Sequence, residues 1–223
     1  MKNNKSLNVL GCVPMTLNTL LELAEESQSF FSFNILKNIP VEINELFAPN
    51  KNWNITNLNA YELSLQFKKK DEFAFSVVGV NSKESVFNWF KAKSEITKGQ
   101  FINLIHPTSY VSPSVILSNG IQLESLSTIA ARSSIGFGVN IKRNCSLGHH
   151  CEIGDYVTIN PGVTLSSFVK VGVNTMIGSG VSVKNDISIG KNCIIGVGSV
   201  VVKNIPDNSV AYGNPCVVKA NNV

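Results

Sequence analysis

Residues 135–164 read IGFGVN-IKRNCS-LGHHCE-IGDYVT-INPGVT, blocks of six that each begin with isoleucine or leucine. The spacing extends in both directions, so that every sixth residue from Ile105 to Val201 is aliphatic. These positions are Ile105, Val111, Leu117, Leu123, Ile129, Ile135, Ile141, Leu147, Ile153, Ile159, Leu165, Val171, Ile177, Val183, Ile189, Ile195 and Val201. Such an unbroken register indicates a repeat in which each block makes the same contact with a core.

The other positions of the block predict its shape. The fourth residue after each aliphatic one is small or β-branched, as at Cys145 and Val157, which suits a strand facing a narrow interior. The third residue after it is often Gly, Asn or Asp, which tolerate positive φ, so each block is expected to turn a corner there. Three blocks would close one triangular coil, with neighbouring coils about 4.8 Å apart. The sequence therefore predicts a parallel β-helix, whose sites lie on outer faces or between copies.

Residues 1–102 have a different pattern. Apolar runs at 7–10, 31–36 and 73–78 are typical of buried strands, and helical spacing follows at 16–26 and after Ser82. This alternation predicts a small α/β domain with a parallel sheet. Ligands of such sheets bind at the carboxyl ends of the strands. The candidate ligand-binding residues are therefore Gly11, Cys12, Val13, Pro14, Gly79 and Asn81.

Those loops could equally be plain connections. No GxGxxG follows the first strand, because Gly11 is followed by Cys12, Val13 and Pro14, so dinucleotide binding is not supported.

Composition narrows the function classes. The formal charge of the 223-residue chain is +4, and the Lys68–Lys70 run has no interleaved aromatics, so nucleic acid is not an expected partner. No apolar run is long enough for a spanning helix, and no signal-peptide pattern opens the chain, so we expect a cytoplasmic protein that does not bind a membrane. The five cysteines contain no CxxC pair, and three of them take the small inward position of the repeat, which predicts a packing role.

Three segments carry a family resemblance: NLIHP at 103–107, GHHCEIGD at 148–155 and GNP at 213–215. Together with the six-residue period, they resemble the hexapeptide-repeat acyltransferases, and among these the nucleotide-sugar N-acetyltransferases and sialic acid O-acetyltransferases. The resemblance implies a Rossmann-like domain that binds a nucleotide sugar at 1–102 and a left-handed β-helix with a carboxyl-terminal tail at 103–223. It also implies a homotrimer that uses acetyl-CoA and no metal.

The chain has three histidines, His106, His149 and His150. His106 and His149 are more than two coils apart, which argues against a shared zinc ion. His150 takes the corner position after Leu147, and histidine is enriched at positive φ, so a structural role is expected for it. His149 precedes the corner and should project outward.

The resemblance implies that His149 is the general base, because its position matches the catalytic histidine of the family. An attacking amine or hydroxyl must lose a proton, and imidazole titrates in the suitable range. Two departures from the family pattern stand out. The residue after the base is usually acidic in the family and is His150 here, which leaves open what orients His149. Thr158 replaces a second family histidine and is the expected contact of the acetyl carbonyl.

The resemblance also places the acyl donor in the groove between neighbouring copies, with Gly180 and Gly198 beside it. Each candidate can also be explained as a corner or surface residue of the repeat. The candidates for binding acetyl-CoA are Ser167, Gly178, Ser179, Gly196, Lys203, Asn214 and Pro215.

The leading hypothesis is an acetyl-CoA-dependent N-acetyltransferase that acts on a nucleotide-linked amino (dideoxy) sugar for bacterial surface glycans. An O-acetyltransferase of sialic-acid type remains open, because the residues require only that a nucleophile be deprotonated. A non-catalytic sugar-binding or scaffold protein remains the alternative from another class.

Overall fold

The computed structural model describes residues 5–42 and 50–222 of the chain. These residues divide into two compact units. The first comprises the residues up to 78 and residues 82–104, and the second comprises residues 79–81 and those from 105 onward. No helix within the described ranges is long and apolar enough to cross a membrane.

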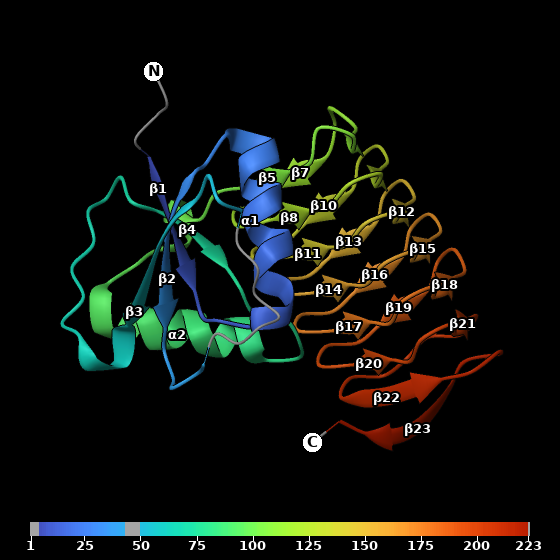
Figure 1. Ribbon diagram of the computed structural model, residues 1–223. Helices are drawn as coiled ribbons and strands as arrows, with labels where there is room; N and C mark the ends of the chain where they lie inside the picture. Colours follow the sequence, from blue (N-terminus) through green and yellow to red (C-terminus); the bar gives the residue numbers. More distant parts are fainter. Residues whose placement is uncertain (1–4, 43–49, 223) are drawn as a thin grey trace. The chain divides into compact units, whose positions relative to one another are not determined.

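The first unit is built on a parallel sheet with the strand order β3-β2-β1-β4. Short 3-10 helices belong to its connecting segments (Figure 1): η1 lies between β3 and β4, and η2 follows α2. The elements are β1 (Ser6–Leu10), α1 (Pro14–Gln28), β2 (Ser32–Lys37), β3 (Asn54–Asn59), η1 (Ala60–Glu62), β4 (Glu72–Phe75), α2 (Ser82–Ser94) and η2 (Lys98–Gln100).

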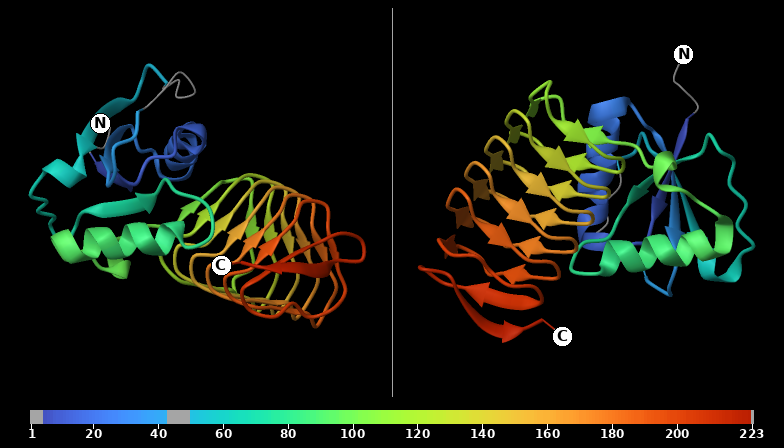
Figure 2. Two further views of the ribbon diagram at one scale, coloured as in Figure 1. Left: turned by 90° about the horizontal axis from the view of Figure 1, so that it is seen from below. Right: turned by 180° about the vertical axis from the view of Figure 1, so that it is seen from behind.

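Each face of this sheet is covered by one helix (Figure 2). Buried leucines of α1, including Leu17, pack with Leu7 and Val9 of β1 in one apolar cluster. On the other face, Phe101 stacks on Phe75 with ring centroids 4.6 Å apart and contacts Phe87 of α2 at 5.7 Å. The predicted small α/β sheet is thus confirmed. The edge strand β3 was not among the predicted strands.

The second unit is a prism with three faces, each a sheet of stacked short strands (Figures 1 and 2). Face 1 holds β5 (Leu104–Ile105), β8 (Gln122–Leu123), β11 (Asn140–Ile141), β14 (Thr158–Ile159), β17 (Met176–Ile177), β20 (Ile194–Ile195), β22 (Ser209–Tyr212) and β23 (Val217–Asn221). Face 2 holds β6 (Tyr110–Val111), β9 (Thr128–Ile129), β12 (Ser146–Leu147), β15 (Thr164–Leu165), β18 (Ser182–Val183) and β21 (Val200–Val201). Face 3 holds β7 (Ile116–Leu117), β10 (Ser134–Ile135), β13 (Glu152–Ile153), β16 (Lys170–Val171) and β19 (Ser188–Ile189).

Neighbouring strands of a face are 18 residues apart, as in the pairing of Leu147 with Leu165. The chain therefore completes one coil in three blocks, as the period predicts. The aliphatic positions point inward and form one continuous core, in which Ile141, Ile159 and Ile177 are fully buried. At the carboxyl end, β22 and β23 pair as an antiparallel hairpin.

The corners lie where the repeat predicts them. Every sixth residue from Gly120 to Gly198 has a positive φ. Most are glycine, asparagine or aspartate, but the set also includes Leu126, Tyr156 and Phe168.

The inward cysteines are buried packing residues, as predicted. Cys145, Cys151 and Cys193 lie in the prism core with no more than 3% of their surface exposed. Burial raises the pKa of the Cys145 thiol to about 11, and it also raises the pKa of the Cys151 thiol. These thiols therefore stay protonated at neutral pH and are poor nucleophiles.

Candidate active site

The turn between β12 and β13 carries His149 and His150 at the edge where face 2 meets face 3. His150 has φ 58°, and its N–H donates to the Ala131 carbonyl of the preceding coil at 3.0 Å. The corner position predicted for it is confirmed. His149 is exposed, which agrees with an outward-pointing imidazole.

Phe168 packs against both imidazoles. Its ring stacks on His150 with centroids 4.8 Å apart and an interplanar angle of 20°. It meets His149 edge-on at 5.1 Å and 88°. Phe168 was not among the predicted site residues, although it takes the corner one coil after His150, so the 18-residue stacking rule could have found it.

The two imidazoles also contact each other directly. The Nδ1 atoms of His149 and His150 lie 2.9 Å apart, which is hydrogen-bonding distance. Only the Nε2 side of the His149 ring is then left for a substrate. His150, which stands where the family usually has an acidic residue, thus supplies the contact that orients His149.

Ser167 and Lys203 lie on the same edge of the prism as His149. Ser167 follows one coil after His149 and is partly exposed, and Lys203 follows two coils after Ser167 and is exposed. A Cβ atom on Gly148 would lie 2.7 Å from the Ser167 nitrogen, so the backbones of these two coils are tightly packed here. The structure therefore brings these two predicted donor-binding residues into one column with His149.

The predicted glycines lie on a different edge, where face 1 meets face 2. Gly178, Ser179 and Gly196 are in the turns after β17 and β20. Beside them runs a column that we call the glycine strip, formed by Gly162, Gly180 and Gly198. A Cβ atom on Gly180 or Gly198 would have no neighbour within 4 Å, so the strip exposes backbone without side chains.

Asn214 and Pro215 lie in the turn of the terminal hairpin, between β22 and β23, and both are exposed. The Cys216 N–H donates to the Val200 carbonyl at 2.8 Å, and the Val200 N–H donates to the Gly213 carbonyl at 3.0 Å. These bonds hold the turn against β21, so it closes the end of face 2.

Thr158 lies at an outward position of face 1, paired with Asn140, and only 1% of its surface is exposed. Its Oγ1 atom has no hydrogen-bond partner among the described residues. Because His149 lies on the edge between faces 2 and 3, a single chain does not bring Thr158 and His149 together.

The predicted nucleotide-sugar loop connects β1 to α1, and Pro14 is the first helical residue. The N–H of Gly11 donates to the Leu36 carbonyl at 2.9 Å, and that of Val13 donates to the Ser76 carbonyl at 3.1 Å. Pro14 has no N–H. Much of the capacity of this helix start to donate hydrogen bonds to a ligand is therefore already used.

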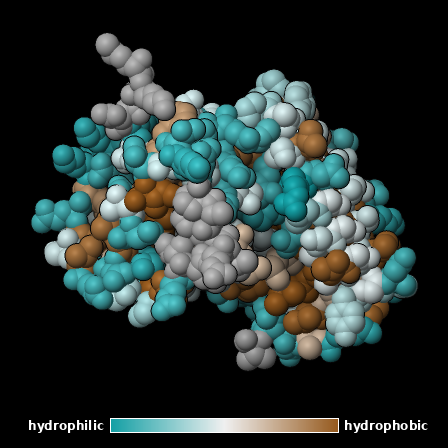
Figure 3. All heavy atoms as spheres, viewed as in Figure 1, coloured by the Kyte–Doolittle hydropathy of each residue, from teal (hydrophilic) through white to brown (hydrophobic). Residues whose placement is uncertain are grey.

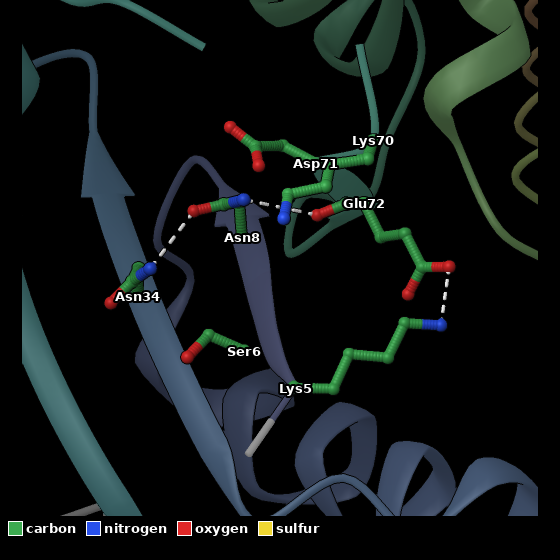
Figure 4. A pocket seen from close by; sticks show the side chains of 7 residues that line it. All are labelled: Lys5, Ser6, Asn8, Asn34, Lys70, Asp71 and Glu72. Atoms are coloured by element: carbon green, nitrogen blue, oxygen red, sulfur yellow. Dashed lines mark hydrogen bonds and ion pairs between the residues drawn. The ribbon is translucent and has the colours of Figure 1, made fainter. Parts of the chain in front are cut away.

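Gly79 and Asn81 lie in the segment between β4 and α2, both at positive φ, and Asn81 is exposed. A polar pocket of about 660 Å³ lies elsewhere in the first unit, toward the amino ends of its strands (Figure 4). In it, Asn34 donates to Asn8 at 3.0 Å, and Lys5 pairs with Glu72. Its lining is Lys5, Ser6, Asn8, Asn34, Lys70, Asp71 and Glu72, which includes none of the predicted ligand residues.

Within residues 5–42 and 50–222, no three or more His, Cys, Asp or Glu side chains gather in a way that could hold a metal ion.

Residues 132–167 match the model of the bacterial transferase hexapeptide family (six repeats). A comparison with curated protein sequences finds no match.

Solved structures resemble the chain over nearly its whole length. A perosamine N-acetyltransferase variant from Caulobacter crescentus, in complex with CoA and GDP-perosamine, is 22% identical, with a TM-score of 0.77 and 98% coverage of both chains. The acetyltransferase domain of PglB from Neisseria gonorrhoeae, in complex with acetyl coenzyme A, is 23% identical, with a TM-score of 0.80 and coverage of 97% of this chain and 100% of that one. WeeI from Acinetobacter baumannii is 17% identical, with a TM-score of 0.78 and the same coverage.

These likenesses confirm the predicted fold, a small parallel α/β sheet followed by a left-handed parallel β-helix. Residues 132–167 thus match bacterial transferase hexapeptide repeats, and the chain as a whole has the fold of the perosamine N-acetyltransferase and of the PglB acetyltransferase domain.

Proposed function

We propose that the protein is an acetyl-CoA-dependent N-acetyltransferase whose substrate is a nucleotide-linked amino (dideoxy) sugar, with His149 as the general base. The observation that carries the proposal is the exposed His149 ring, whose Nδ1 contacts His150 and whose Nε2 is left for a substrate. The similar structures with bound CoA, acetyl coenzyme A and GDP-perosamine support the choice of reaction.

The reaction requires mainly two groups from the protein, a general base and a hydrogen-bond donor. When bound, acetyl-CoA supplies the acetyl group as a thioester. The amine nitrogen of the sugar forms a bond to the acetyl carbon while His149 Nε2 takes a proton from that amine. The carbon–sulfur bond then breaks, and the proton passes from His149 to the leaving thiolate. The backbone N–H of Ser167, one coil away, is the proposed donor to the tetrahedral oxyanion.

The glycine strip fits the arm of the acyl donor. Side-chain-free backbone at Gly180 and Gly198 leaves room for a narrow, flexible chain to lie directly on the peptide groups. Gly178, Ser179 and Gly196 border the strip, and exposed Lys203 offers a positive charge to a phosphate. Asn214 and Pro215, at the end of face 2, are proposed to lie beside the nucleotide part of CoA.

A second copy of the chain is needed to complete such a site. His149 and the glycine strip lie on different edges, but both edges border face 2. A groove formed by one edge of one copy and the other edge of its neighbour would contain both. A closed ring of three copies repeats this contact without leaving an open end, so a homotrimer belongs to the proposal.

Exposed apolar side chains on the prism surface support the proposed association of copies of the chain. Brown patches gather over its carboxyl-terminal coils in Figure 3. Val197 is 76% exposed, and Val202, Val217 and Val218 are also exposed. Exposed aliphatic groups of this kind favour contact with another chain.

The nucleotide sugar is proposed to bind at the carboxyl ends of strands β1 and β4. The proposed contacts are Gly11, Cys12, Val13 and Pro14 on one loop and Gly79 and Asn81 on another. Thr158 remains a proposed substrate contact, because its buried hydroxyl has no partner among the described residues and can be satisfied by a ligand.

Incubation of the purified protein with acetyl-CoA and a panel of UDP-, dTDP- and GDP-linked amino sugars tests this function. Thiol release from CoA should accompany a mass increase of one acetyl group on one member of the panel, at a turnover of roughly 1–10³ per second. Fragmentation should place the acetyl group on nitrogen. An oxygen-acetylated product would favour the sialic-acid type of reaction, and no thiol release with any sugar would favour a binding or scaffold protein.

A further inference from the structure

The contact between His149 and His150 restricts where their protons can be. The two Nδ1 atoms are 2.9 Å apart, so one must carry the shared hydrogen and the other must present a lone pair. Two protonated Nδ1 atoms would repel each other, and two bare ones would lose the bond. The tautomers of the two rings are therefore linked.

The surroundings hold the second ring in place. The backbone of His150 is fixed at a left-handed corner and bonded to Ala131, and its ring lies flat on Phe168. Phe168 also donates its N–H to the His149 carbonyl at 3.0 Å and braces the His149 ring edge-on. Both rings are thus constrained by packing as well as by the bond that joins them.

We propose that His150 is a positioning residue, whose Nδ1 accepts the Nδ1 hydrogen of His149 and so keeps the His149 Nε2 lone pair free. The direction of this hydrogen bond rests on the proposed function, because His149 can act as a base at Nε2 only when its hydrogen is on Nδ1. Free imidazole prefers the opposite tautomer, with hydrogen on Nε2, in which His149 could not act as a base at that atom. A neutral His150, with hydrogen on its own Nε2, prevents this.

The arrangement also makes the site sensitive to a single proton. A proton that binds His149 Nε2 blocks the base directly. A proton that binds His150 Nδ1 turns this atom into a donor, which forces the hydrogen of His149 onto Nε2 and blocks the base as well. Either event removes the free lone pair on His149 Nε2.

Several ionisable groups lie near the pair, and a substitution of His150 leaves them in place. Arg132 takes the corner one coil before His150, and Asp186 takes the corner two coils after it. Glu152 and Lys170 form an ion pair at 2.9 Å on the adjoining strands β13 and β16.

Nitrogen-15 NMR of the imidazole rings tests the tautomers without any substrate. The chain has only three histidines, so the ring signals can be assigned by substitution. In the wild type with both rings neutral, we expect hydrogen on Nδ1 of His149 and on Nε2 of His150. In H150F, which cannot accept a hydrogen bond, His149 should revert to the Nε2–H form. A wild-type His149 with hydrogen on Nε2, or an unchanged tautomer in H150F, would overturn the proposal.

Kinetics of two matched variants test the effect on catalysis. Phenylalanine suits this corner, because Phe168 adopts φ 62°, and asparagine suits it because Asn144 adopts φ 59°. H150F should lower kcat by about 10- to 100-fold with little change in KM, because the base is present but in the wrong tautomer. H150N, whose amide oxygen can accept the hydrogen bond, should recover most of the loss.

The two proposals fail in different ways. Correct tautomers without transfer to any sugar would remove the proposed function and leave the histidine pair standing. Transfer that depends on His149 but is equally fast in wild type, H150F and H150N would leave His150 with only a structural role at the corner.

Discussion

Replacing His149 with alanine is expected to lower kcat by about 10²- to 10⁴-fold, the usual contribution of a general base. KM should change little, because the lost group acts on the proton of the attacking amine rather than on substrate binding. The fold should survive, since His149 is exposed and the corner itself is formed by His150. Steady-state release of the CoA thiol at saturating substrates measures the effect.

His106→Ala is the matched control. It removes the same side chain from the same prism, where His106 Nδ1 contacts Thr108 Oγ1 at 2.8 Å and takes no part in the proposed chemistry. Turnover of this variant should equal that of the wild type. Equal turnover of wild type and His149→Ala would remove His149 from the mechanism.

Ile159→Ala should destabilise the prism by about 2–5 kcal/mol, the range for truncation of a fully buried aliphatic side chain. Ile159 has no exposed surface and is stacked in register between Ile141 and Ile177 on face 1. The tightly paired coils on either side limit how far the backbone can move to fill the cavity. The midpoint of urea unfolding at a fixed protein concentration should therefore fall clearly.

Ile116→Ala makes the same chemical change at an outward position. Ile116 is 72% exposed, so its truncation should alter the free energy of unfolding by less than about 0.5 kcal/mol. Similar shifts for the two variants would contradict the assignment of the six-residue positions to the core.

The core of the prism could be predicted from the sequence because one contact is repeated in every block. Each aliphatic position faces the same interior. A shift of one block out of this register would therefore bury a polar side chain. Conversely, β3 was missed because its sequence, NITNLN, is polar and its residues are half-buried or exposed at the edge of the first sheet. The apolar alternation that predicts a buried strand is weak there.

At some corners of the prism, the residue type alone does not predict the positive φ. Asn144 and Gly162 favour positive φ by themselves, but Leu126, Tyr156 and Phe168 adopt it only because the neighbouring coils impose the turn. The corner at His150 was predictable from the block.

The site was predictable in part. An outward His149 follows from its place before the corner. Its contact with His150 depends on side-chain rotamers, and that with Phe168 joins residues from two coils, so neither follows from local pattern. The separation of Ser167 and Gly178 onto two edges follows from counting blocks around the prism.

Each site is proposed to take His149 from one copy and the glycine strip from its neighbour, and subunit mixing tests this arrangement most directly. His149→Ala lacks the base, and Gly180→Trp fills the strip, so each protein alone should be inactive while forming trimers. When the two are dissociated, mixed in equal amounts and reassociated, random assembly gives about a quarter of the interfaces both an intact His149 and an intact strip. Recovery of about a quarter of wild-type turnover is the predicted result. Mixed trimers that form, as shown by mass spectrometry, but recover no activity would contradict a site shared between copies.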